Sequence, residues 1–168
     1  HLNDPAFADT LPEVIGRAKA AGVNALIVPA YDPESLTRTA ELAALYPDAV
    51  FPAYGLHPWF INAAVDLDAL ASCISLKDAV AVGEIGLDFS PECPPAEVQV
   101  PVFLRQLDMA AESGLPVLIH CRKAYDRLHD ILKSYRGRIR GVLHSYSGGK
   151  DAMPRFLDLG FYISFSGS

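Results

Sequence analysis

Four short apolar segments, each ending in a residue that can bind a metal, constrain this chain more than any other feature. The segments lead into His57, Glu84, His120 and His144. A continuous apolar run is typical of a strand buried on both faces of a parallel sheet. The carboxyl ends of such strands share one edge, where α/β enzymes place their active sites. We therefore expect three imidazoles and one carboxylate to converge, as they do in a metallohydrolase.

Apolar segments alternate with amphipathic ones along the whole chain, which predicts repeated strand–helix units. We expect strands at residues 23–28, 49–54, 79–84, 116–120, 139–144 and 161–165. We expect helices at residues 11–21, 34–46, 67–75, 124–134 and 152–159, and one more around Phe103 and Leu107. Proline is tolerated only in the first turn of a helix, so the pattern predicts that this last helix starts near Pro101.

This alternation implies a parallel sheet with right-handed crossovers. An open doubly wound sheet and a (β/α)₈ barrel both satisfy it. Liganding residues on four successive strands favour the TIM-type barrel, and no glycine-rich dinucleotide fingerprint follows the first strand. A full barrel takes about 250 residues. We therefore expect a single α/β domain over residues 1–168, truncated at both ends, with about six of eight strands and the first and last missing. A complete six-stranded domain is the alternative.

Composition narrows the classes of function. No stretch approaches the roughly 20 apolar residues of a membrane span, so we expect no membrane association. Three cysteines without CxxC spacing predict free thiols in the cytoplasm. The net charge of −6 argues against broad electrostatic capture of nucleic acid. Seven basic residues nevertheless lie within residues 122–140. They form either a solvated helix face or a local patch that steers phosphate, with Arg122 as its strongest member.

The residue types at the strand ends fit a metal site. Imidazole nitrogen suits Zn²⁺, Mn²⁺ or iron, and a carboxylate adds affinity for harder ions. Glu84, His120 and His144 are the predicted ligands. His57 is equally compatible with ligation and with a contact to a substrate phosphate. Asp88 lies four residues beyond Glu84, so we expect it to orient a neighbouring histidine instead.

Two further residue types bear on the substrate. Trp59 either stacks on a base or packs under its loop. Ser147 follows the strand that ends in His144 and can offer hydroxyl and amide donors to phosphate oxygens.

With these strand-end residues, the chain resembles the TatD family of metal-dependent deoxyribonucleases, which are amidohydrolase-like TIM barrels. The resemblance covers essentially the whole sequence in order. Its carriers are His1-Leu2 and the segments YGLHPW (54–59), GEIGLDF (83–89), LPVLIHCR (115–122), GVLHSYSG (141–148) and YISFSG (162–167).

The resemblance implies two divalent metal ions, either Mg²⁺, Mn²⁺ or Zn²⁺. His1 would match the second histidine of the family's His-x-His pair and hold the first metal. Glu84 would bridge the two metals, and His120 and His144 would hold the second. Glu84 and His57 would be catalytic. The reaction would be hydrolysis of DNA phosphodiester bonds from an end, so DNA is the expected partner and no obligate protein partner is evident.

The resemblance also implies a substrate contact by His57, and from their positions after strand ends we expect Arg122 and Ser147 to bind substrate phosphates as well. Two family positions have no counterpart in the printed sequence: the first histidine of the His-x-His pair and the aspartate of a Glu-Thr-Asp segment. Their absence would make hydrolysis by these residues alone very weak. Two other functions remain open, a related barrel hydrolase of a small amide, ester or lactone, and an inactive fragment that binds metal or DNA.

Overall fold

The sheet has six parallel strands in sequential order. The computed structural model describes residues 1–62, 65–76 and 78–166. Its strands pair in the order β1 to β6, each parallel to the next. They are β1 (Leu26–Pro29), β2 (Val50–Tyr54), β3 (Ala81–Asp88), β4 (Val117–Arg122), β5 (Gly141–Leu143) and β6 (Tyr162–Ile163). Sequential parallel pairing is the strand order of a (β/α)₈ barrel, so the predicted fold class is confirmed.

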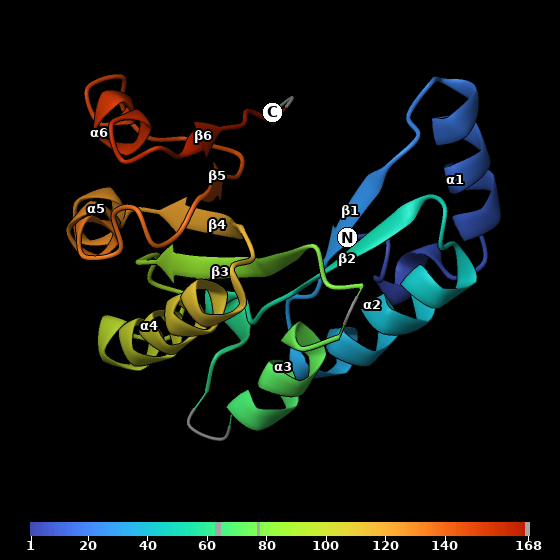
Figure 1. Ribbon diagram of the computed structural model, residues 1–168, viewed down its shortest axis with the longest axis horizontal. Coiled ribbons are helices and arrows are strands. Elements are labelled where there is room, and N and C mark those ends of the chain that lie inside the picture. Colours follow the sequence, from blue (N-terminus) through green and yellow to red (C-terminus); the bar gives the residue numbers. More distant parts are fainter. Residues whose placement is uncertain (63–64, 77, 167–168) are drawn as a thin grey trace.

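Helices connect the strands and lie on the outer side of the arc that the sheet forms, with β1 and β6 at its two ends (Figure 1). The α-helices are α1 (Leu11–Ala20), α2 (Pro33–Leu45), α3 (Leu67–Ile74), α4 (Ala96–Ser113), α5 (Tyr125–Lys133) and α6 (Met153–Leu157). Two short 3₁₀ helices are η1 (Pro5–Phe7) and η2 (Pro58–Phe60). In the described ranges, no helix combines the length and the apolar character needed to cross a membrane.

The main core lies between the sheet and its helices and is densest around β3 and α4. Ile85 and Leu87 of β3 and Phe103 and Leu107 of α4 have no exposed surface. Burying each such side chain contributes about 1.5–3 kcal/mol. The core therefore fixes β3 firmly, and β3 carries Glu84.

Two expected boundaries were wrong in ways that matter for the site. β3 continues four residues past Glu84 to Asp88, and β4 continues past His120 to Arg122. Glu84 and His120 thus lie inside strands and not at their ends, so the sheet holds the backbones of both residues more rigidly than a loop would. Residues 86–88 of β3 pair with residues 120–122 of β4, which is why both strands extend together.

The start of α4 was also predicted incorrectly. The helix begins at Ala96, with Pro95 as its N-cap, so Pro101 lies in its second turn. Proline there removes one N–H donor and crowds the preceding turn. Phe103 and Leu107 of this helix are fully buried, and their packing outweighs the local cost.

Close backbone approach explains the glycines around Glu84. A Cβ atom at Gly86 would lie 1.9 Å from the carbonyl oxygen of His120, and Gly86 has φ +150°. A Cβ atom at Gly55 would lie 2.7 Å from the backbone of Gly83. The register between β3 and β4 also shifts between Val82 and Ile85, which is a bulge. Glycine therefore lets the segment that follows β2 approach Gly83 and lets β4 approach Gly86, on either side of Glu84 in the sequence.

Candidate metal centre

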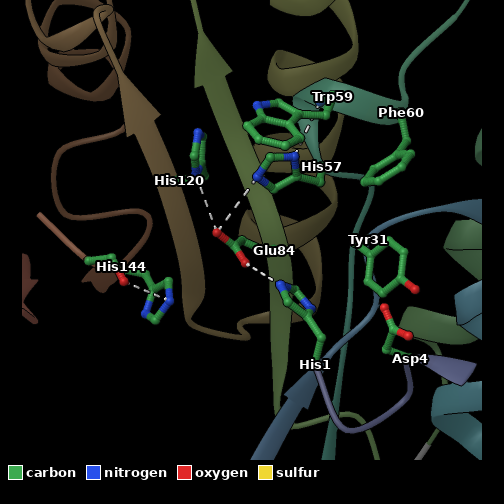
Figure 2. A pocket seen from close by; sticks show the side chains of 10 residues that line it. His1, Asp4, Tyr31, His57, Trp59, Phe60, Glu84, His120 and His144 are labelled. Carbon is green, nitrogen blue, oxygen red and sulfur yellow. Dashed lines mark hydrogen bonds and ion pairs between the residues drawn. The ribbon is translucent and has the colours of Figure 1, made fainter. Parts of the chain in front are cut away.

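A cavity of about 370 Å³ lies at the carboxyl end of the strands and gathers the predicted residues (Figure 2). All five residues that were predicted as ligands or catalytic groups line it: His1, His57, Glu84, His120 and His144. Its other lining residues are Asp4, Tyr31, Trp59, Phe60 and Ser145. The convergence expected from four separate strand ends is therefore confirmed.

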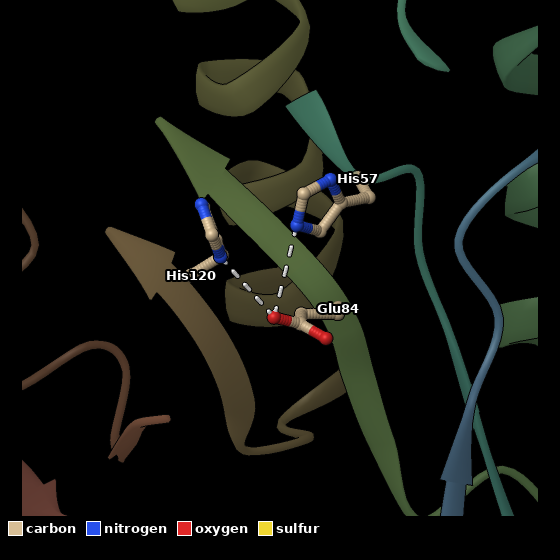
Figure 3. Close-up of side chains that lie close together, drawn as sticks. All are labelled: His57, Glu84 and His120. Carbon is tan, nitrogen blue, oxygen red and sulfur yellow. Dashed lines mark ion pairs between the residues drawn. The ribbon is translucent and has the colours of Figure 1, made fainter. Parts of the chain in front are cut away.

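Glu84 is the centre of this group. Its Oε1 atom lies 3.5 Å from His120 Nδ1 and 3.9 Å from His57 Nε2, while its Oε2 atom lies 3.7 Å from His1 Nε2. The two oxygens therefore face different imidazoles. Figure 3 shows His57 and His120 on the same side of the carboxylate. One ligand atom from each of Glu84, His57 and His120 lies within 4.8 Å of the others.

Glu84 is only 4% exposed, yet its environment favours the carboxylate form. Burial by itself would raise the pKa of Glu84, but the interaction with His120 and the charges of the surrounding histidines bring its pKa below the ordinary value. A buried carboxylate needs compensating partners. Imidazoles supply them here.

Asp88 fixes the orientation of His120. The Oδ2 atom of Asp88 lies 2.9 Å from His120 Nε2 and accepts a hydrogen bond from Trp59 Nε1 at 2.7 Å, while Oδ1 accepts one from the Ser90 amide at 2.9 Å. Burial alone would raise the pKa of Asp88, but these hydrogen bonds hold it far below its usual value. The carboxylate is then an acceptor only, so His120 Nε2 carries a proton.

Burial would lower the pKa of His120, but the hydrogen bonds and charges of Glu84 and Asp88 raise it above its ordinary value. Because Asp88 holds the proton on Nε2, Nδ1, the atom facing Glu84, is the one that would lose its proton and offer a lone pair to a metal. A carboxylate that accepts from the distal nitrogen of a ligating histidine is a common arrangement in metal sites. The sequence-based expectation that Asp88 orients a neighbouring histidine is confirmed.

His57 has the opposite arrangement. Its Nδ1 atom accepts a hydrogen bond from the backbone amide of Trp59 at 3.2 Å, so this nitrogen holds a lone pair. Burial lowers the pKa of His57 to about 4, and the positive charge of His120 adds to this effect although Glu84 and Asp88 oppose it. The neutral ring therefore carries its proton on Nε2, which faces Glu84. In this protonation state the Nε2–H group is a hydrogen-bond donor directed toward Glu84.

His144 and His1 complete the cavity from opposite ends of the sheet. His144 directly follows β5, and its Nε2 atom lies 3.0 Å from the hydroxyl of Ser145. His1 lies near the end of β1 and packs edge-on against Tyr31 at 5.0 Å between ring centres. Both rings are largely exposed and turn toward the same opening as Glu84.

Two predicted substrate contacts do not line the cavity. Arg122 ends β4 with an exposed side chain, and the exposed Ser147 places its hydroxyl 3.2 Å from that of Tyr125. The basic window also divides. Arg122 lies at the carboxyl end of β4, whereas Arg138 and Arg140 precede β5 and lie at the opposite end of the sheet. The window is therefore not one patch beside the site. The last predicted motif ends at Gly167, which lies outside the described residues.

Sequence reasoning missed three lining residues, Asp4, Tyr31 and Phe60. Tyr31 stands two residues past the end of β1, so the rule that located the other strand-end residues would have found it. Phe60 belongs to η2, and Asp4 caps η1 by accepting a hydrogen bond from the amide of Ala6 at 2.8 Å. Neither position carries a periodic signal in the sequence.

The donor set fits a divalent metal. Imidazole nitrogens and a carboxylate are the ligands that Zn²⁺ and Mn²⁺ take in proteins. His120 offers a lone pair on an oriented ring, and Glu84 is ionised with two oxygens that face different sides. Within the described ranges, only the group of His57, Glu84 and His120 brings three such ligand atoms this close together.

Known proteins with similar sequences and folds identify the family. The model of TatD related DNase matches residues 1–168. The "3'-5' ssDNA/RNA exonuclease TatD" of Edwardsiella piscicida is 35% identical over 99% of this chain and 65% of its own length. The "uncharacterized metal-dependent hydrolase YabD" of Bacillus subtilis is 33% identical over 99% of this chain and 66% of its own length.

A solved structure agrees with these sequences. The TatD homolog YJJV of Escherichia coli superimposes with a TM-score of 0.89 at 35% identity and covers 97% of this chain and 64% of that protein. This chain thus spans slightly less than two thirds of the length of these relatives. The resemblance seen in the sequence motifs is confirmed, and the chain belongs to the family of TatD-related DNases.

Proposed function

We propose that this chain carries the core of a metal-dependent nuclease that hydrolyses phosphodiester bonds of DNA from an end. The observation that carries the proposal is the placement of the two oxygens of Glu84 against different imidazoles. A buried ionised carboxylate in this position is suited to bridge two cations. The names of the relatives from Edwardsiella piscicida and Bacillus subtilis, an exonuclease and a metal-dependent hydrolase, support the same conclusion.

In this proposal, His1 and Glu84 would hold one divalent cation, and Glu84, His120 and His144 would hold the other. Bound cations of this kind polarise a phosphate and make a hydroxide available near neutral pH. The chain's own residues position the substrate. His57 donates its Nε2–H to a phosphate oxygen, and its neutral ring keeps that proton in place because Nδ1 is held by the Trp59 amide.

Arg122 and Ser147 have a more distant role in this proposal. Both are exposed and lie beyond the cavity, at strand ends that face the same side. We propose that Arg122 contacts a phosphate further along the strand, where its charge contributes affinity without reading the base sequence.

The test is cleavage of end-labelled single-stranded DNA in Mg²⁺ or Mn²⁺ by the full-length wild-type protein and by its Glu84→Gln variant. We expect EDTA and Glu84→Gln each to abolish cleavage, because EDTA removes the divalent cations and Glu84→Gln removes the carboxylate charge that would bridge them. Glu97→Gln is the matched control, since Glu97 is an exposed residue in the first turn of α4. Undiminished cleavage by Glu84→Gln would refute the proposal. Hydrolysis of a simple carboxylic ester without any cleavage of DNA would favour a small-ester hydrolase instead.

A further inference from the structure

Three aromatic side chains form one side of the cavity that contains Glu84. We call Tyr31, Trp59 and Phe60 the aromatic wall. Tyr31 follows β1, and the other two belong to η2 after β2. Trp59 is 51% exposed and Phe60 is 42% exposed. Figure 2 shows the three rings beside His57, across the opening from His144.

The rings of the aromatic wall are held in place. Trp59 donates its indole N–H to Asp88 at 2.7 Å and packs edge-on against His57 at 5.6 Å between ring centres. The ring centre of Phe60 lies 5.2 Å from the ring centre of Tyr31. A ligand that stacks on these rings would not have to immobilise them first, and such preorganisation increases affinity.

A packing role under the loop does not account for the exposure of Trp59. The indole N–H of Trp59 is satisfied by Asp88, yet the residue stays about half exposed and lines the cavity. A fixed apolar surface that stays exposed beside polar ligands is typical of a binding site. Other exposed aromatic side chains of the described chain, such as Tyr162 and Phe165, do not line this cavity.

Charge gives a second reason to expect stacking. The chain has a net charge of −6, and the basic residues Arg138 and Arg140 lie at the far end of the sheet. Electrostatic attraction of a polyanion is therefore weak. Stacking of bases on aromatic rings can supply about 1–3 kcal/mol per base regardless of sequence. The Tyr31 hydroxyl already accepts a hydrogen bond from Arg38 at 3.3 Å, which leaves the wall few groups for reading base edges.

We propose that the aromatic wall binds the base of a terminal nucleotide, with Trp59 as the principal stacking surface, while the phosphate of that nucleotide lies at Glu84 and His120. The inference rests on the proposed function and adds the site that holds the base. A base must leave its duplex neighbour to reach this wall, so the wall selects unpaired ends. It accepts all four bases with similar affinity because stacking does not depend on base edges.

Trp59 is the only tryptophan in the sequence, so its fluorescence reports on the wall directly. The probes are thymidine 5′-monophosphate and 2-deoxyribose 5-phosphate, which share sugar and phosphate and differ by the base. The full-length protein is titrated with each in Mg²⁺ or Mn²⁺, with excitation at the red edge of tryptophan absorption. We expect saturable quenching by the nucleotide and unchanged emission with the sugar phosphate.

Substitutions inside and outside the aromatic wall should affect nucleotide binding differently. Phe60→Leu should weaken nucleotide binding at least about fivefold, the effect of losing roughly 1 kcal/mol of stacking. Tyr162→Leu, which removes an exposed aromatic ring on β6, should leave it unchanged. The Trp59→Leu variant has no tryptophan to report binding, so its binding is measured by calorimetry. It should bind the nucleotide and the sugar phosphate with equal affinity.

Equal quenching by the two probes would overturn the inference, and so would unaltered nucleotide binding by Phe60→Leu and Trp59→Leu. These outcomes are independent of the nuclease assay. Cleavage of DNA with no preference for the nucleotide over the sugar phosphate would leave the proposed function standing and refute the wall. Saturable, base-dependent quenching without any cleavage would support the wall and refute the nuclease.

Discussion

Replacing Asp88 with asparagine tests the hydrogen-bond arrangement that orients His120. The carboxylate accepts from Trp59 and His120 through one oxygen and from the amide of Ser90 through the other. Asparagine has one acceptor oxygen, so its NH₂ group must face a donor in either orientation. At least one charge-assisted hydrogen bond is lost, which costs about 1.5–3 kcal/mol. Domains of this kind have about 5–15 kcal/mol of stability, so the variant should still fold.

The pH dependence of this effect has a defined sign. The folded-state pKa of Asp88 lies well below its usual value, so its contribution to stability is present above the unfolded pKa of about 3.9 and is lost as pH falls. The free energy of unfolding of wild type should therefore exceed that of Asp88→Asn at neutral pH, and the difference should shrink on acidification. Denaturant unfolding in EDTA at several pH values measures this.

An exposed aspartate outside the site serves as the control for Asp88→Asn. Asp9→Asn alters an exposed aspartate before α1 and should change the free energy of unfolding little at any pH. The affinity of Asp88→Asn for Mn²⁺ should fall about 10- to 100-fold, as is typical for loss of a residue that orients a metal ligand. Equal unfolding free energies of Asp88→Asn and wild type at neutral pH, or a gap that persists in acid, would refute the reasoning.

Two further substitutions test separate parts of the site. His57→Gln should lower the rate of DNA cleavage about 10²- to 10³-fold, the usual loss for one donor that stabilises a transition state, while Mn²⁺ affinity measured by equilibrium dialysis stays within a few-fold of wild type. Loss of metal binding by His57→Gln would show that His57 is a ligand. Gly86→Ala should reduce the free energy of unfolding by about 1–3 kcal/mol or more, because the new Cβ atom would lie 1.9 Å from the carbonyl of His120. Gly149→Ala, where a Cβ atom meets nothing within 4 Å, should change it far less, and equal losses in the two alanine variants would contradict the close approach of β3 and β4.

Apolar patterning predicted most of the fold because each buried strand is a continuous apolar run. It failed where pairing and packing extend an element beyond its apolar residues. β3 reaches Asp88 because residues 86–88 pair with β4, and α4 starts at Ala96 because the stripe around Phe103 is buried. Neither effect can be read from local composition. Hydropathy marks the middle of an element better than its ends.

The sequence predicted which residues meet at the candidate site, but not the contacts that determine their protonation. His57, Glu84 and His120 follow apolar runs, so the parallel sheet brings them together. The proton positions on the two imidazoles depend on their partners, Asp88 and the Trp59 amide, and a sequence does not contain those contacts. The basic window likewise divides between the two ends of the sheet because β5 lies between Arg140 and His144.

The most direct test of the proposed metal centre is a crystal structure of the protein soaked in Mn²⁺, with the ions located by their anomalous scattering. We expect an ion bound to Glu84 Oε1 and His120 Nδ1, with His57 Nδ1 still accepting the hydrogen bond of the Trp59 amide. An ion held by His57, or the absence of any ion at Glu84, would contradict it.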